Sequence, residues 1–247
     1  CGYSAAVIHG LQVPNTVLGS VHYCANGTSH RGSPLIRHHL RLAPQDIVSN
    51  TGVRVTSLRK TLVDCLCTSD FRVGLAITDS AIHWELAGKR EIECWIEKDG
   101  KGRRGIRQAR ETVAWADGRS ENGGESIARA TMIKLGFVAP YLQVEVFDQM
   151  EPDNPKRGDF GWRLEGGSWV IGELDGLGKY RKGDVAGTRN GLDAAIRALA
   201  AERRRESHLC LSGFKIVRFS MQDVLDTAYF ERLLTAAGVP RREEPSD

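Results

Sequence analysis

The spacing of apolar residues predicts helices and short strands in the first half of the chain. Leu58, Leu62 and Leu66 recur at helical spacing directly after Ser57, a residue type that often precedes helices, so a helix is expected over 58–67. The other elements expected in this half are helices over 4–11 and 73–84, extended segments around 17–23 and 35–42, and a strand over 53–57.

The second half has a different order of elements. Leu142, Val144 and Val146 alternate with polar residues, which is the period of a half-buried strand. The expected order is helix, three strands, helix, strand and a closing helix. In sequence these cover 125–135, 142–146, 159–164, 169–174, 184–207, 214–219 and 224–236.

A polar, glycine-rich segment over 117–124 lies between the two halves and predicts a domain break. We expect an α+β domain over 1–118 and an α/β domain over 119–247. Hydrophobic residues make up 41% of the 247 positions and charged residues 26%, as in ordinary globular proteins. No apolar stretch approaches the roughly 20 residues that a membrane helix needs.

The six cysteines are scattered, and no two form a Cys-x-x-Cys pair, which argues against a zinc ribbon. One interpretation of the six cysteines is that they form disulfides. Reduced thiols in a cytoplasmic protein are the favoured one, because a chain of this size does not need disulfides for stability. The chain begins at Cys1 rather than Met, and we expect it to be part of a longer sequence.

Charge is unevenly distributed along the chain, whose formal net charge is +3. Residues 1–118 contain 15 Lys and Arg against 11 Asp and Glu, and residues 119–247 contain 19 against 20. Six of the basic residues lie within 98–110. This segment has two readings, a solvated loop with a helix start and a nucleic-acid contact surface. The residues expected to contact nucleic acid there are Lys101, Arg103, Arg104 and Arg107.

Acidic residues mark the candidate site in the second half. Strand alternation places Glu173 and Asp175 on one face, about 7 Å apart, and a paired strand carrying Asp159 would lie roughly 5 Å away. Three carboxylates in this arrangement offer the oxygen ligands that Mg²⁺ prefers. Lys179, just beyond the strand, is expected to contact a phosphate or to position the attacking water. The alternative reading is a surface hairpin with exposed acids, although Glu173 interrupts an apolar run.

Four motifs in order make residues 119–247 resemble the PD-(D/E)xK nuclease superfamily, in its branch related to the very-short-patch repair endonuclease. The motifs are a helical Glu at Glu125, R-x-D-F-x-W over 157–162, E-x-D-G-x-x-K-Y over 173–180, and E-R-R-R-E over 202–206 where the family has an E-K-R-R-E helix end. The resemblance implies a restriction-endonuclease-like αβββαβ fold. It also implies a DNA substrate and Mg²⁺, with Mn²⁺ as an alternative.

The resemblance assigns roles to individual residues. Asp159 and Glu173 become metal ligands with Asp175 nearby, and Glu125 completes the acidic cluster. Asp175 replaces the usual Lys of the E-x-K pattern, and Lys179 is the nearest substitute. Arg205 has two readings, a phosphate contact and an ordinary ion pair with Glu202.

The first half resembles AbiEi-type antitoxin and regulator proteins in residues 4–11 and 55–64. A winged helix usually precedes this region in those proteins and is largely missing here. His9, His38 and His39 do not form a convincing metal-ligand set.

Two functions are therefore expected from the sequence. The first is a Mg²⁺-dependent DNA endonuclease in phage defence or mobile-element biology. The second is a non-enzymatic DNA-binding regulator or antitoxin that keeps a nuclease-like platform. The candidate partners are DNA, a second copy of the chain, and a toxin or other defence-system protein, without a membrane.

Overall fold

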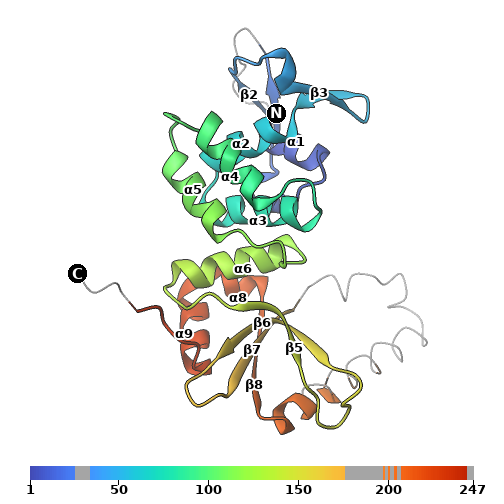
Figure 1. Ribbon diagram of the computed structural model, residues 1–247, viewed down its shortest axis with the longest axis vertical. Helices are drawn as coiled ribbons and strands as arrows, with labels where there is room; N and C mark the ends of the chain where they lie inside the picture. The colour runs from blue at the N-terminus through green and yellow to red at the C-terminus, as the bar shows by residue number, and fades with distance from the viewer. Residues whose placement is uncertain (26–33, 176–196, 198–199, 201–202, 205–206, 244–247) are drawn as a thin grey trace. The chain divides into compact units, whose positions relative to one another are not determined.

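A computed structural model of the 247-residue chain shows a mixed α/β protein with two compact units, Cys1–Ala130 and Thr131–Asp247 (Figure 1). The structure describes residues 1–25, 34–175, 197, 200, 203, 204 and 207–243. The division lies inside helix α6 (Gly123–Lys134), downstream of the domain break that the sequence predicts after residue 118. The position of that break stays a prediction.

The first unit is built from helices and two small sheets. Its helices are α1 (Gly2–Ile8), α2 (Leu58–Thr68), α3 (Phe71–His83), α4 (Lys89–Asp99) and α5 (Ile106–Trp115), with short 3-10 helices η1 (Asn15–Val17) and η2 (Pro44–Asp46). Strands β1 (Val21–Cys24) and β2 (Leu35–His38) pair in parallel, and β3 (Ile47–Asn50) and β4 (Val53–Thr56) pair antiparallel. The three helices predicted before residue 85 are confirmed, with small differences at their ends.

Helix α2 shows how the local sequence builds the core of the first unit. The Ser57 hydroxyl accepts the Lys60 N–H at 3.3 Å and so begins the helix where strand β4 ends. Leu62 and Leu66, one helical turn apart, are buried in the same core cluster as Ile92 and Ile96 of α4. The apolar stripes of these helices therefore face one another, as their spacing predicts.

A buried ion pair holds the middle of α6 against α3. Arg129 Nη2 lies 2.7 Å from Asp79 Oδ2, and the two side chains are 4% and 1% exposed. Asp79 also accepts the Asp117 N–H at 2.8 Å, and Arg129 donates to the Trp115 carbonyl at 2.8 Å. Burial raises the pKa of Asp79 although Arg129 acts against this. The Asp117 N–H bond also holds the start of the glycine-rich segment 117–124 against α3.

The second unit contains a four-stranded sheet in the order β5-β6-β7-β8. Its strands are β5 (Tyr141–Val146), β6 (Lys156–Arg163), β7 (Trp169–Asp175) and β8 (Phe214–Ser220). The first three pair antiparallel, and β8 pairs in parallel with β7. All four strands were predicted, and they are confirmed. The helix predicted over 184–207 lies largely outside the described residues.

The closing helix predicted over 224–236 is present, but its predicted start is too early. Two helices, α8 (Met221–Leu225) and α9 (Thr227–Ala237), occupy this part of the chain. Asp226 separates them, and its carboxylate accepts the Tyr229 N–H at 3.0 Å, which caps α9. An N-terminal cap of this kind begins a new helix rather than continuing the previous one.

The two faces of the sheet pack differently. On one face Phe160 and Phe219 stack with ring centres 5.8 Å apart, and Phe230 of α9 meets Phe219 at 4.9 Å. On the other face Ile171 packs with Val146 and Leu209. No helix among the described residues is long and apolar enough to cross a membrane.

Candidate active site

Glu173 and Asp175 lie at the end of β7, where both meet one arginine. The parallel register of β7 and β8 places Glu173 opposite Arg218 and Asp175 opposite Ser220. Arg218 Nη2 lies 2.5 Å from Glu173 Oε2, and Arg218 Nη1 lies 3.3 Å from Asp175 Oδ1. Since side chains two residues apart on a strand share a face, one guanidinium reaches both carboxylates.

Asp159 lies on the neighbouring strand β6, close to the backbone of the same segment. Phe160 pairs with Gly172, so Asp159 and Glu173 are the next positions along the two strands. Asp159 Oδ2 accepts the Leu174 N–H at 2.8 Å. The structure therefore brings the Asp159 carboxylate to the backbone of the residue that follows Glu173, and this bond fixes its orientation.

Glu173 is buried, so the groups that stabilise its negative charge matter for the stability of the fold. Glu173 is only 7% exposed, and an ionised carboxylate at such a position costs several kcal/mol unless a cation or hydrogen bonds offset it. The side chain of Arg218 is 26% exposed and that of Asp175 is 54% exposed. Three carboxylates gathered at one edge of the sheet are the kind of charge that a divalent cation favours.

The donor chemistry fits a divalent metal ion of the Mg²⁺ type, because the carboxylates of Asp159, Glu173 and Asp175 are hard oxygen ligands. No group of three or more His, Cys, Asp or Glu within the described ranges has an arrangement that holds a metal ion as it stands. In the described cluster, Arg218 occupies a cation position between Glu173 and Asp175. A metal ion that binds Glu173 therefore has to share or replace that contact.

Glu125 has a local role at the start of α6. It is 3% exposed, and its carboxylate accepts the Glu121 N–H at 2.8 Å and a hydrogen bond from the Asn122 side-chain amide. The Asn122 side chain in turn accepts the Glu125 N–H at 3.0 Å. Glu125 and Asn122 thus cap the helix reciprocally. The part assigned to Glu125 in the acidic cluster stays a prediction.

Two further predicted site residues, Lys179 and Arg205, lie outside the described residues, as do Tyr180 and Glu202. Their predicted roles are unchanged. Arg218 is a cation at this site that the sequence-based prediction does not include. A signal for it was present, since Arg218 interrupts an apolar strand between Val217 and Phe219 in the same way that Glu173 interrupts β7.

The predicted basic surface divides into exposed and paired residues. Lys101, Arg104 and Arg107 are exposed before and within the first turn of α5. Arg103 instead lies 2.7 Å from Asp64, which also binds Lys60 at 2.6 Å. Arg103 therefore has a structural ion pair, and the other three remain available to a polyanion.

Asp148 and His208 form a second polar cluster in this unit, which the sequence analysis does not predict. His208 Nδ1 lies 3.1 Å from Asp148 Oδ2, and Asp148 is fully buried. Burial opposes ionisation of Asp148. Hydrogen bonds from the Met150 N–H at 2.9 Å and from His208 nevertheless hold its pKa below the ordinary value. This cluster joins the loop after β5 to the helical segment before β8.

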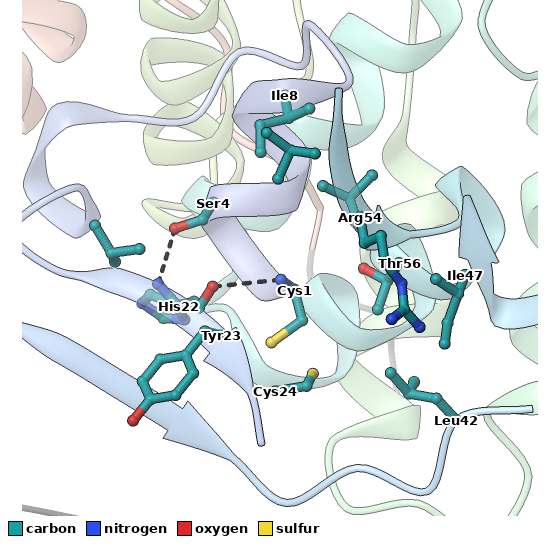
Figure 2. A pocket seen from close by; sticks show the side chains of 13 residues that line it. Cys1, Ser4, Ile8, His22, Tyr23, Cys24, Leu42, Ile47, Arg54 and Thr56 are labelled. Carbon is teal, nitrogen blue, oxygen red and sulfur yellow. Dashed lines mark hydrogen bonds between the residues drawn. The ribbon is translucent and has the colours of Figure 1, made fainter. Parts of the chain in front are cut away.

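A cavity of about 460 Å³ lies in the first unit, between α1, β1 and the β3–β4 hairpin (Figure 2). Its lining is mostly apolar, with Ile8, Val21 and Leu42 among its residues. The Ser4 hydroxyl accepts the His22 N–H at 2.8 Å at its edge. None of the predicted site residues lines it, so this cavity is not the acidic site.

Two curated proteins are similar to this chain. They are the uncharacterized proteins MT2308 and Rv2248, from two strains of Mycobacterium tuberculosis, and each is 31% identical over 162 residues. The similarity covers 66% of this chain and 58% of each relative, so the chain spans less than two thirds of their length. No family model matches the sequence. No solved structure matches the fold.

Proposed function

We propose that the second unit is a Mg²⁺-dependent deoxyribonuclease that hydrolyses phosphodiester bonds, with Asp159 and Glu173 as the principal metal ligands. The observation that carries the proposal is the adjacent placement of these two acids on β6 and β7, one of them buried beside a guanidinium. Acids are seldom buried without a partner, and buried acids that lie side by side with a cation are common at functional sites.

The element order supports a restriction-endonuclease-like fold for this unit. Helix α6 precedes three antiparallel strands, and β8 then pairs in parallel with β7. These elements agree with an αβββαβ core, whose second helix would fall in the segment before β8 that lies largely outside the described residues. The acidic residues lie on the second and third strands, as the resemblance to the PD-(D/E)xK superfamily implies.

The residues of the chain supply orientation and charge for this chemistry. The Leu174 N–H fixes Asp159, and Arg218 fixes Glu173, so both carboxylates are held before substrate binds. When bound, Mg²⁺ supplies polarisation of a phosphoryl oxygen and a lower pKa of an attacking water. Asp175, whose side chain is 54% exposed, would supply a further carboxylate at the solvent-facing edge of this site.

Cleavage of supercoiled plasmid tests the proposal. The full chain is incubated with plasmid and Mg²⁺, with and without chelator, beside Asp159→Asn and Glu173→Gln. We expect nicked or linear plasmid with the wild-type chain only, at a rate reduced at least about a hundredfold in each variant. Cleavage that is equal in all three proteins, or that survives the chelator, contradicts the proposal.

A DNA-binding regulator is the second candidate function. Three exposed basic residues, Lys101, Arg104 and Arg107, favour it. It requires affinity for DNA that falls with salt and that is retained in Asp159→Asn. A second copy of the chain, a toxin partner and a cytoplasmic location remain predictions from the sequence.

A further inference from the structure

Arg218 is a cation that contacts two carboxylates of the site for which we propose a metal ion. Its Nη2 atom lies 2.5 Å from Glu173 Oε2 and its Nη1 atom lies 3.3 Å from Asp175 Oδ1. The guanidinium therefore uses two donors on two acids of one strand. A planar group with donors in a fixed fork makes such a contact with little further loss of freedom.

The pairing of β7 with β8 fixes the position of Arg218. Glu173 and Arg218 are directly paired in the parallel register of β7 and β8. The neighbours of Arg218, Val217 and Phe219, are buried and anchor the strand on the opposite face. Because the register fixes both backbones, the Cα atom of Arg218 stays opposite Glu173, and only its guanidinium can move when another cation binds.

We propose that Arg218 and a divalent metal ion compete for the Glu173 carboxylate, so that Arg218 sets the metal affinity of the site, and that the released guanidinium binds a phosphodiester oxygen of DNA. This inference rests on the proposed function for the identity of the metal and the substrate. Two cations beside one carboxylate repel each other, so each lowers the affinity of the other. A phosphodiester anion beside the metal is the group that a displaced guanidinium recognises.

The proposal predicts opposite effects of one substitution on two measurements. Arg218→Met removes the competing charge and keeps an apolar stem of similar length, so metal binding becomes tighter by about tenfold. The same variant loses the phosphate contact, so DNA cleavage becomes slower, by about tenfold or more. A purely structural role for Arg218 would weaken both properties together.

The test is a titration of the full chain with Mn²⁺, in which free Mn²⁺ is read by electron paramagnetic resonance. Wild type is compared with Arg218→Met and with Arg232→Met, a control in which an exposed arginine of α9 is replaced. We expect the dissociation constant to fall about tenfold in Arg218→Met and to change less than about twofold in the control. Equal or weaker Mn²⁺ binding in folded Arg218→Met, or no binding in either protein, overturns the inference.

A second measurement follows Arg218 in the wild-type chain, in which the ion pair with Glu173 is intact. The Nε–Hε resonance of Arg218, assigned by its loss in Arg218→Lys, is followed while diamagnetic Mg²⁺ is added to the wild-type chain. We expect this resonance to shift and to saturate with the same midpoint as metal binding. A resonance that stays unchanged at saturating Mg²⁺ contradicts the competition even if Arg218→Met does not fold.

The outcomes separate this inference from the proposed function. Tighter Mn²⁺ binding in Arg218→Met without cleavage by any protein leaves the competition standing and removes the nuclease. Metal-dependent cleavage by the wild type, together with unchanged Mn²⁺ affinity in Arg218→Met, leaves the nuclease standing and removes the competition.

Discussion

Arg218 donates to Glu173 across the β7–β8 pair, with 2.5 Å between Nη2 and Oε2, because the parallel register places the two residues directly opposite each other. The pair explains how an acid that is 7% exposed is tolerated within an apolar strand. It also identifies the group with which any metal ion at Glu173 has to contend.

Stability of the first unit depends on the buried pair of Asp79 and Arg129. We expect Arg129→Met to lower the free energy of unfolding by about 3–5 kcal/mol, because it leaves Asp79 buried without its cation. Urea denaturation followed by circular dichroism measures the change. Arg119→Met is the matched control, since Arg119 binds Asp117 at the surface with its side chain 63% exposed, and we expect a loss of at most about 1 kcal/mol there.

The double variant Asp79→Asn with Arg129→Met distinguishes two costs of Arg129→Met, the loss of the ion pair itself and the burial of an unpaired Asp79 carboxylate. It is expected to recover part of the stability that Arg129→Met loses, since a neutral amide costs less than a carboxylate at a buried position. Equal stability of Arg129→Met and Arg119→Met would show that the pair does not hold α6 to α3.

Acid sensitivity of the second unit is expected from Asp148. Its pKa lies below the ordinary carboxyl value, so the ionised form stabilises the fold. This contribution is fully present above the unfolded pKa of about 3.9 and is lost as the pH falls through the lower folded pKa. We therefore expect Asp148→Asn to be less stable than wild type at neutral pH, with a difference that shrinks below about pH 4.

Chemical denaturation between about pH 2 and pH 7 measures this difference. Asp153→Asn, a change at an exposed aspartate of the same loop, is the control and is expected to follow wild type. A destabilisation by Asp148→Asn that is the same at every pH would contradict the role given to the ionised carboxylate.

The exposed basic residues of the first unit predict a salt-dependent contribution to DNA binding. Replacing Lys101, Arg104 and Arg107 by alanine is expected to weaken binding to a duplex of arbitrary sequence. It is also expected to reduce the slope of log affinity against log salt by about 2–3, because each residue neutralises one phosphate. Fluorescence anisotropy at several salt concentrations measures both quantities.

A charge-matched control replaces three other exposed arginines of the first unit, namely Arg41, Arg54 and Arg90. If the control reduces the slope as much as the first set does, net charge and not a defined surface governs binding. Unchanged affinity in both variants would remove the basic segment from the DNA-binding account.

The sequence predicts those parts of the fold that depend on local pattern. Alternation over 142–146 and the Ser57 cap both lead to elements that the structure contains. Glu173 was identified because it interrupts an apolar run. Asp226 carries a local signal as well, because aspartate is a preferred N-cap residue and Asp226 caps α9.

Contacts between distant segments follow from register and not from local pattern. Arg218 meets Glu173 only because β8 returns alongside β7 in parallel, and no periodicity within either strand specifies that alignment. The same holds for Asp148 and His208, which lie far apart in the chain. Arg218 is a charge within an apolar strand, and His208 is a polar residue in a helical segment. Each is a weak signal in the sequence, and only the fold shows which residue it contacts.

The most direct test of the central claim is anomalous diffraction from crystals of the full chain soaked in Mn²⁺. We predict an anomalous peak at about 2.0–2.3 Å from carboxylate oxygens of Asp159 and Glu173, with the Arg218 guanidinium moved away from Glu173. A Mn²⁺ peak elsewhere, or none at this site in crystals of a chain that cleaves DNA with Mn²⁺, would contradict the account.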